Sequence, residues 1–103
     1  MALLSIKGGN KIVNKMNFIE ISEAGAPEVL KLKQMSVPIP KVNEVLIKVE
    51  ACGVNRPDVL QRKGLYPPPS GAPTFPGLEV AGEIVSLGES VSKWNIGDKV
   101  CSL

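Results

Sequence analysis

The sequence predicts an all-β protein with one short helix. Ten glycines and nine prolines among 103 residues are too many for a bundle of helices, because both residue types destabilise helix interiors. Hydrophobic residues make up 44% of the chain and charged residues 21%, which is typical of a globular domain. Several short segments with strand composition lie between these turn-forming residues, and only one segment has helix signals. The length suits a single domain.

Residues 1–15 are predicted to form an added N-terminal arm. Gly8, Gly9 and Asn10 favour a turn. We expect short strands on either side of it, at residues 2–6 and 11–13.

The next two expected strands are separated by a turn. Residues 17–22 have strand composition, and residues 24–27 contain the Gly and Pro of a turn. In the second strand, at 29–37, lysines alternate with leucines at Leu30 and Leu32, the pattern of a strand with one solvent-exposed face. Pro38 and Pro40 follow and end this strand, because proline cannot donate to a sheet.

Residues 44–52 give the strongest strand pattern, followed by the helix. Val45, Ile47, Val49 and Ala51 share one face of the strand, and the charged residues share the other. The helix begins after Asn55, an N-cap residue. Its first turn holds Pro57 and Asp58, and Gly64 ends it after about two turns.

A proline-rich loop and two further strands complete the chain. Five prolines and three glycines at 64–77 exclude regular structure and present Leu65, Tyr66 and Phe75 at small entropic cost. We expect a strand at 78–87, with a bulge or bend at Gly82. A turn at Gly97 and Asp98 leads into a last strand at 99–103.

Composition excludes several classes of function. The net charge is +2, and no basic run is interleaved with aromatic residues, so we expect no nucleic acid as a partner. No apolar run approaches the about 18 residues of a membrane span, and we expect no membrane association. Two cysteines predict a reducing, cytoplasmic setting. Residues 1–19 contain no acidic residue, which leaves a mitochondrial presequence as the alternative.

Metal and nucleotide signals are absent from the sequence. The chain has no histidine, and two cysteines with scattered carboxylates make no zinc site, so we expect no metal. The glycines at 77, 82 and 88 lack the G-x-G-x-x-G spacing of a dinucleotide-binding turn. Cys52 ends a strand without a basic neighbour in sequence and is interpreted as a core residue.

Two polar residues are candidates for a site, and each also has a structural interpretation. Asn55 serves as a helix cap or as a hydrogen-bond donor to a ligand. Tyr66, beside three prolines, serves in packing or faces a ligand. Asp58 is interpreted as the acidic residue of the first helical turn.

Four motifs in order resemble one family. They are EVLIKVEACGVNRPD at 44–58, QRKGLYPPPSG at 61–71, GLEVAGEIVSLG at 77–88 and WNIGDKV at 94–100. Together they are similar to the N-terminal, GroES-like domain of the medium-chain dehydrogenase/reductase superfamily, in its zinc-free quinone oxidoreductase branch of the p53-inducible type. The resemblance covers residues 16–103. It implies a partly open GroES-like β-barrel.

The resemblance also implies a chemistry. Zinc-dependent members have a cysteine ligand at the position of Asn55 and a histidine ligand at that of Leu78, so this sequence matches the zinc-free branch. That branch transfers a hydride from a nicotinamide cofactor, usually NADPH, to a quinone or enone. Asn55 and Tyr66 are the implied catalytic residues, which meet the acceptor oxygen as it gains charge, and Asn55 is also the implied cofactor contact.

Members of that family continue past the position of Leu103 into the rest of the GroES-like domain and then into a Rossmann domain. We therefore expect a barrel that is incomplete at its C-terminus, a truncated domain that is inactive alone, and a separate Rossmann-domain chain as one partner. Open sheet edges predict a homo-oligomer. Two alternatives remain: a non-catalytic interaction module or gene remnant, and a 10-kDa co-chaperonin, whose ending resembles residues 82–85 and 97–100.

Overall fold

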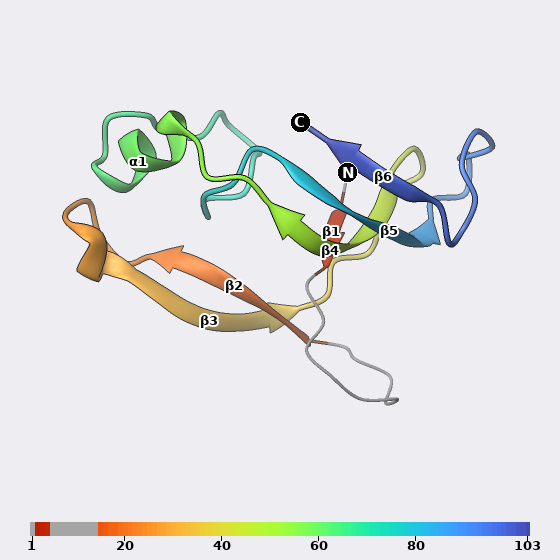
Figure 1. The fold of residues 1–103 in the computed structure, drawn as a ribbon, viewed down its shortest axis with the longest axis horizontal. Helices are drawn as coiled ribbons and strands as arrows, with labels where there is room; N and C mark the ends of the chain where they lie inside the picture. Colours follow the sequence, from red (N-terminus) through yellow and green to blue (C-terminus); the bar gives the residue numbers. More distant parts are fainter. Residues whose placement is uncertain (1, 5–14) are drawn as a thin grey trace.

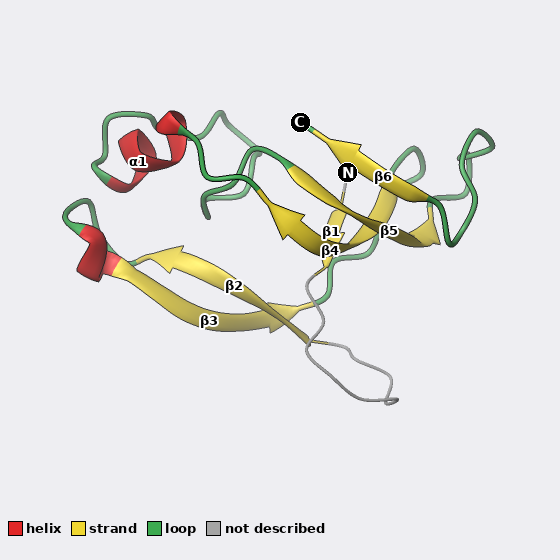
Figure 2. Cartoon of the chain, viewed as in Figure 1, coloured by secondary structure: helices red, strands yellow, loops and turns green. Residues whose placement is uncertain are grey.

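The computed structural model describes residues 2–4 and 15–103, which form two β-sheets and one short helix (Figures 1 and 2). In chain order the elements are β1 (Ala2–Leu4), β2 (Lys15–Ile21), a 3-10 turn (Pro27–Val29), β3 (Leu30–Ser36), β4 (Val45–Cys52), α1 (Arg56–Arg62), β5 (Val80–Leu87) and β6 (Lys99–Ser102). One sheet has the strand order β1-β4-β5-β6, and the other is the β2-β3 hairpin. The predicted all-β class is confirmed, and the two sheets stay open rather than closing into a barrel.

The four-stranded sheet is built around the antiparallel pair β4 and β5. Val45 pairs with Leu87 and Cys52 with Val80, with shifts of register in between. One shift falls between Val49 and Ala51, opposite Gly82, so the predicted irregularity at this glycine is confirmed. Gly82 is needed there, because a Cβ would fall on the main-chain carbonyl oxygen of Lys48 in the next strand.

Some of the buried apolar side chains lie between the two sheets, and others belong to paired strands of the larger sheet. Met16 of β2 packs against Leu46 of β4, and Ile47 and Ile84 are each only 1% exposed. The neighbours Leu46 and Ile47 point to opposite faces of β4 and are both buried, so this strand has no continuous solvent-exposed face. The hairpin covers the Leu46 face, a long-range contact that alternation within β4 alone does not predict.

The expectation that the leucine face of β3 is buried is wrong. Leu32 is 66% exposed and Leu30 40% exposed. Met16 pairs with Met35, and this face of the hairpin turns toward the larger sheet. The leucines lie on the other face of the hairpin, which is solvent-exposed.

An ion pair joins β4 to β6 across β5. The ammonium of Lys99 lies 2.8 Å from the carboxylate of Glu50. The hydrogen bond from Lys99 lowers the pKa of Glu50, and the same bond raises the pKa of Lys99. Its contribution to stability is therefore present above the ordinary glutamate pKa and is lost as the pH falls through the lowered value. The contribution is small, because both side chains are solvent-exposed.

Helix α1 begins and ends where the sequence predicts. Asn55 is the N-cap, and Asp58 accepts a hydrogen bond from the Asn55 main-chain N–H at 2.9 Å. At the other end, Gly64 has φ +79°, and the Leu65 N–H donates to the carbonyl of Leu60 at 2.8 Å, as in a Schellman motif. The Gly25 N–H donates to the carbonyl of Arg62, which ties the helix end to the tip of the hairpin.

Replacing Gly64 by alanine is expected to lower the free energy of unfolding by about 1–2 kcal/mol, because alanine is strained at positive φ. The added Cβ would also lie 2.9 Å from the Cβ of Ala24. Urea unfolding measures the change. The matched control is Gly71→Ala, which has φ +84° but no atom within 4 Å of the added Cβ. An effect of Gly64→Ala smaller than that of the control would contradict this account of the helix end.

The N-terminal arm adds a strand to this same molecule. Ala2 pairs with Leu46 and Leu4 with Lys48, parallel to β4. This confirms the first part of the expected strand at 2–6. The expected turn at 8–10 and strand at 11–13 lie outside the described residues. Within the described part of the chain, α1 is far too short to cross a membrane and no longer apolar helix is found.

Candidate functional site

The candidate site is formed by α1 and the proline-rich loop that follows it. The loop runs irregularly from residue 64, as expected, and returns along the helix to β5. Three polar residues bind this returning segment. They are the N-cap Asn55 and, at three-residue intervals along α1, Asp58 and Gln61, which lie on one side of the helix. The three hydrogen bonds are Asn55 Nδ2 to Glu79 Oε1 (2.9 Å), Gly77 N to Asp58 Oδ1 (3.1 Å) and Gln61 Nε2 to the carbonyl of Thr74 (2.9 Å).

Asn55 lies at the junction of β4 and α1, and its main chain and side chain have separate roles. The main chain starts the helix, with its N–H bound by Asp58. The side-chain amide donates to Glu79, 24 residues further along the chain. The interpretation as an N-cap is confirmed, and the side-chain amide donates to a partner outside the helix. A hydrogen bond from this amide to a ligand stays a prediction.

Glu79 is the residue that sequence reasoning missed. It lies just before β5, and its carboxylate occupies the space over Gly53, where a Cβ would fall on the carboxylate. The available signal was a charged residue between Leu78 and Val80 in an otherwise apolar strand start. Pattern alone does not indicate that its partner is Asn55.

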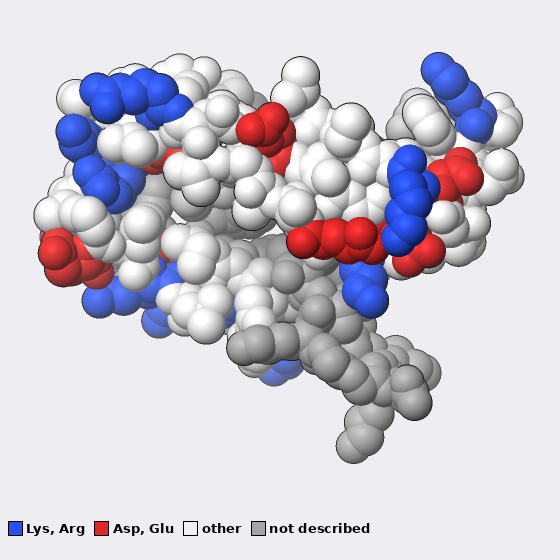
Figure 3. Space-filling view, viewed as in Figure 1, with Lys and Arg blue, Asp and Glu red and all other residues white. Residues whose placement is uncertain are grey.

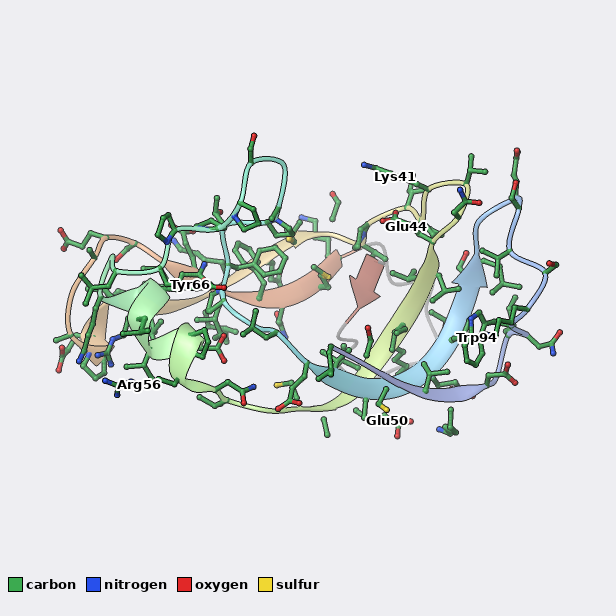
Figure 4. The ribbon with its side chains drawn as sticks, turned by 90° about the horizontal axis from the view of Figure 1, so that it is seen from above. Lys41, Glu44, Glu50, Arg56, Tyr66 and Trp94 are labelled. Atoms are coloured by element: carbon green, nitrogen blue, oxygen red, sulfur yellow. The ribbon has the colours of Figure 1, made fainter. Side chains whose placement is uncertain are left out.

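Tyr66 lies in the loop beyond the C-terminal end of α1. Its side chain is 46% exposed, and Figure 4 shows it beside α1, at the opposite end of the molecule from Trp94. Tyr66 follows Asn55 by 11 positions in the chain, with the seven residues of α1 in between.

The loop presents two of the three side chains expected from the sequence. Leu65 and Tyr66 are exposed, but Phe75 packs against Phe18 of β2, with ring centroids 5.5 Å apart and planes at 55°. Phe75 is partly buried by this contact, which joins the loop to the hairpin. The aromatic contact adds to the three hydrogen bonds that hold the loop.

Positive charge gathers at the α1 end of the molecule. Arg56 and Arg62 belong to α1, and Lys63 is its C-cap. Figure 3 shows basic side chains over this end of the visible face. The acidic residues of the site, Asp58 and Glu79, are both held in hydrogen bonds.

Cys52 is exposed, so its interpretation as a core residue is wrong; it is the last residue of β4, beyond the part of the strand that the hairpin covers. Cys101 is also exposed, and both thiols are free. Among the described residues, no three His, Cys, Asp or Glu side chains are grouped to hold a metal ion. Two surface hollows lie away from α1, and neither Asn55 nor Tyr66 lines them.

Comparisons with known proteins identify the family. Residues 41–103 match the alcohol dehydrogenase GroES-like domain family. The chain is 51% identical over 86 residues to the quinone oxidoreductase of Lama guanicoe, covering 82% of this chain and 26% of that protein.

Solved structures agree with this assignment. The crystal structure of Escherichia coli quinone oxidoreductase complexed with NADPH matches with a TM-score of 0.75 and 36% identity, over 82% of this chain and 26% of that one. The human synaptic vesicle membrane protein VAT-1 homolog-like protein matches with a TM-score of 0.77 and 34% identity, over 84% and 28%. This chain thus spans about a quarter of the length of these relatives. It belongs to the alcohol dehydrogenase GroES-like domain family, as the four motifs predict.

Proposed function

We propose that this chain is the substrate-side domain of an NADPH-dependent quinone oxidoreductase-like enzyme that reduces a quinone or an enone. The carrying observation is the Asn55 side-chain amide, held by Glu79 at the N-terminal end of α1. The similarity to quinone oxidoreductases, one of them solved with NADPH, supports the proposal.

Asn55 and Tyr66 are the proposed catalytic residues. Hydride transfer to a quinone leaves negative charge on an acceptor oxygen, which preorganised hydrogen-bond donors stabilise. The Asn55 amide has a second N–H beyond the one given to Glu79, and the Tyr66 phenol is a donor on an exposed loop. We propose that both residues contact the substrate as hydrogen-bond donors.

The residues described here do not provide a site for the NADPH pyrophosphate. Such groups bind the free N–H groups of a helix N-terminus. At α1, Pro57 has no N–H, and the Asp58 carboxylate occupies the N-cap N–H and adds negative charge. We propose that a Rossmann domain, in the same or a separate chain, holds the cofactor that supplies the hydride. The chain alone would then be inactive, and Asn55 would be its contact with the nicotinamide end.

Quinone binding tests the proposal on the chain itself. Titration of ¹⁵N-labelled protein with duroquinone is expected to shift the signals of Asn55 and the 64–79 loop. The four ring carbons of duroquinone to which a thiol could add all carry methyl groups. The exposed thiols of Cys52 and Cys101 therefore do not readily add to it. Shifts confined to other elements, or none at millimolar quinone, would favour the alternative of a non-catalytic interaction module.

We expect the purified chain to bind no stoichiometric zinc. The sequence has no histidine, and Asn55 and Leu78 stand where zinc-dependent relatives have ligands. Neither an amide nor an alkyl side chain replaces a thiolate or an imidazole. Metal analysis of protein purified without chelator is expected to show only traces, and one zinc per chain would contradict the assignment to the zinc-free branch.

Self-association is a further expectation. The β4 edge of the larger sheet is covered by β1, whereas β6 pairs only with β5 among the described strands. The exposed edge of β6 can pair with a second chain, and a two-fold dimer closes it. Sedimentation at micromolar concentration in a reducing, cytoplasm-like buffer is expected to show a dimer. A monomer with slowly exchanging amides at 100–103 would contradict this.

A further inference from the structure

We propose that Glu79 is a positioning residue whose carboxylate fixes the orientation of the Asn55 side-chain amide toward the quinone oxygen. This inference rests on the proposed function, because it assigns Glu79 to the same site. The hydrogen bond from Asn55 Nδ2 to Glu79 Oε1 is 2.9 Å long and joins residues that are 24 positions apart.

The fold holds Glu79 in this place from two sides. Val80, the next residue, pairs with Cys52, which brings the Glu79 main chain beside the β4–α1 junction. Gly53 at this junction leaves the space that the carboxylate fills, because any Cβ at that position would overlap it. The carboxylate is therefore placed by strand pairing and by the missing side chain of Gly53 together.

The chemistry of the pair determines how Asn55 faces a ligand. An ionised carboxylate only accepts hydrogen bonds, so the amide nitrogen, not the amide oxygen, must turn toward Glu79. A bond to a charged acceptor is stronger than one between neutral groups and holds the amide against rotation. The second N–H then keeps a fixed direction, which is what stabilisation of a developing charge requires.

Asp58 does not replace Glu79 in this role. Both of its carboxylate oxygens accept main-chain N–H groups, one from Asn55 and one from Gly77. Asp58 therefore orients the helix start and the loop. The orientation of the Asn55 side-chain amide therefore depends on Glu79.

The test measures hydrogen exchange of the Asn55 side-chain amide and duroquinone affinity on the labelled chain. In the wild-type protein, the Asn55 side-chain amide is expected to exchange about tenfold more slowly than that of the exposed Asn43 in the same spectrum. Glu79→Ala is expected to abolish this protection and to raise the Kd for duroquinone about as much as Asn55→Ala does. Glu79→Gln keeps a carbonyl acceptor but loses the charge and gains a donor, so it is expected to restore only part of both properties. Glu89→Ala, an exposed acidic residue in a turn, is the matched control.

Gly53→Ala provides an independent variant. It leaves Glu79 chemically intact but displaces its carboxylate, so it is expected to reproduce the effects of Glu79→Ala. Equal exchange of Asn55 and Asn43 in the wild-type protein would overturn the proposal without any variant. If Asn55→Ala weakens quinone binding and Glu79→Ala does not, the positioning role is overturned and the proposed function stands. If Asn55→Ala leaves quinone binding unchanged, the proposed function itself is overturned.

Discussion

Gly82→Ala is expected to lower the free energy of unfolding by about 3 kcal/mol, the largest effect of any single substitution considered for this chain. The new Cβ would fall on the carbonyl oxygen of Lys48, and 3.0 Å from the Cγ2 of the buried Ile47. A main-chain carbonyl in a paired strand cannot move without disturbing the β4–β5 ladder that carries the sheet. Urea unfolding monitored by circular dichroism measures the loss.

Ala81→Gly is the control for this substitution. It changes the neighbouring exposed residue of the same strand by the same single carbon, and is expected to cost less than about 1 kcal/mol. An unfolding midpoint of Gly82→Ala equal to that of the wild-type protein would contradict the close approach of β4 and β5 at this point.

Asn55→Ala is expected to reduce kcat/KM for quinone reduction about 100-fold in an enzyme that contains this domain, since removing one preorganised donor has an effect of that order. A suitable enzyme is a chimera in which this chain replaces the matching 86 residues of the Lama guanicoe quinone oxidoreductase. Tyr66→Phe removes only the phenolic hydroxyl and is expected to reduce kcat/KM about tenfold.

Asn43→Ala controls for the loss of an asparagine away from α1, and is expected to leave kcat/KM unchanged. Asn43 is exposed in the turn before β4. If the kcat/KM of the Asn55→Ala chimera lies within about twofold of the kcat/KM of the unsubstituted chimera, Asn55 is not a catalytic residue, even though it donates a hydrogen bond to Glu79.

Local signals predicted the elements well. The caps of α1 at Asn55 and Gly64 act over three or four residues, so sequence alone locates the helix. The composition predicts the strands 45–52 and 80–87. The position of Gly82 within an apolar run predicts the irregularity of the sheet there. These features depend on neighbours in the chain.

The features that could not be predicted depend on contacts between distant segments. Leu32 is exposed because the hairpin turns its Met16 face to the sheet, and a period of two does not say which face is covered. The partial burial of Phe75 depends on Phe18, which lies 57 positions earlier. The parallel pairing of β1 with β4 is equally non-local.

The candidate site divides in the same way. The motifs indicate Asn55 and Tyr66 as site residues. The role of Glu79 follows only from the structure, which places it beside Gly53 and Asn55. Glycine at 53 is explained by a carboxylate 26 positions away. A single sequence contains both residues but not their proximity.

The most direct test of the central claim is NADPH-dependent duroquinone reduction by the chimera. If this chain is a substrate-side domain, the chimera is expected to reduce quinone at a rate within about tenfold of the parent enzyme, and the isolated chain to show no activity. A folded chimera that binds NADPH as the parent does, but reduces no quinone, would contradict the account.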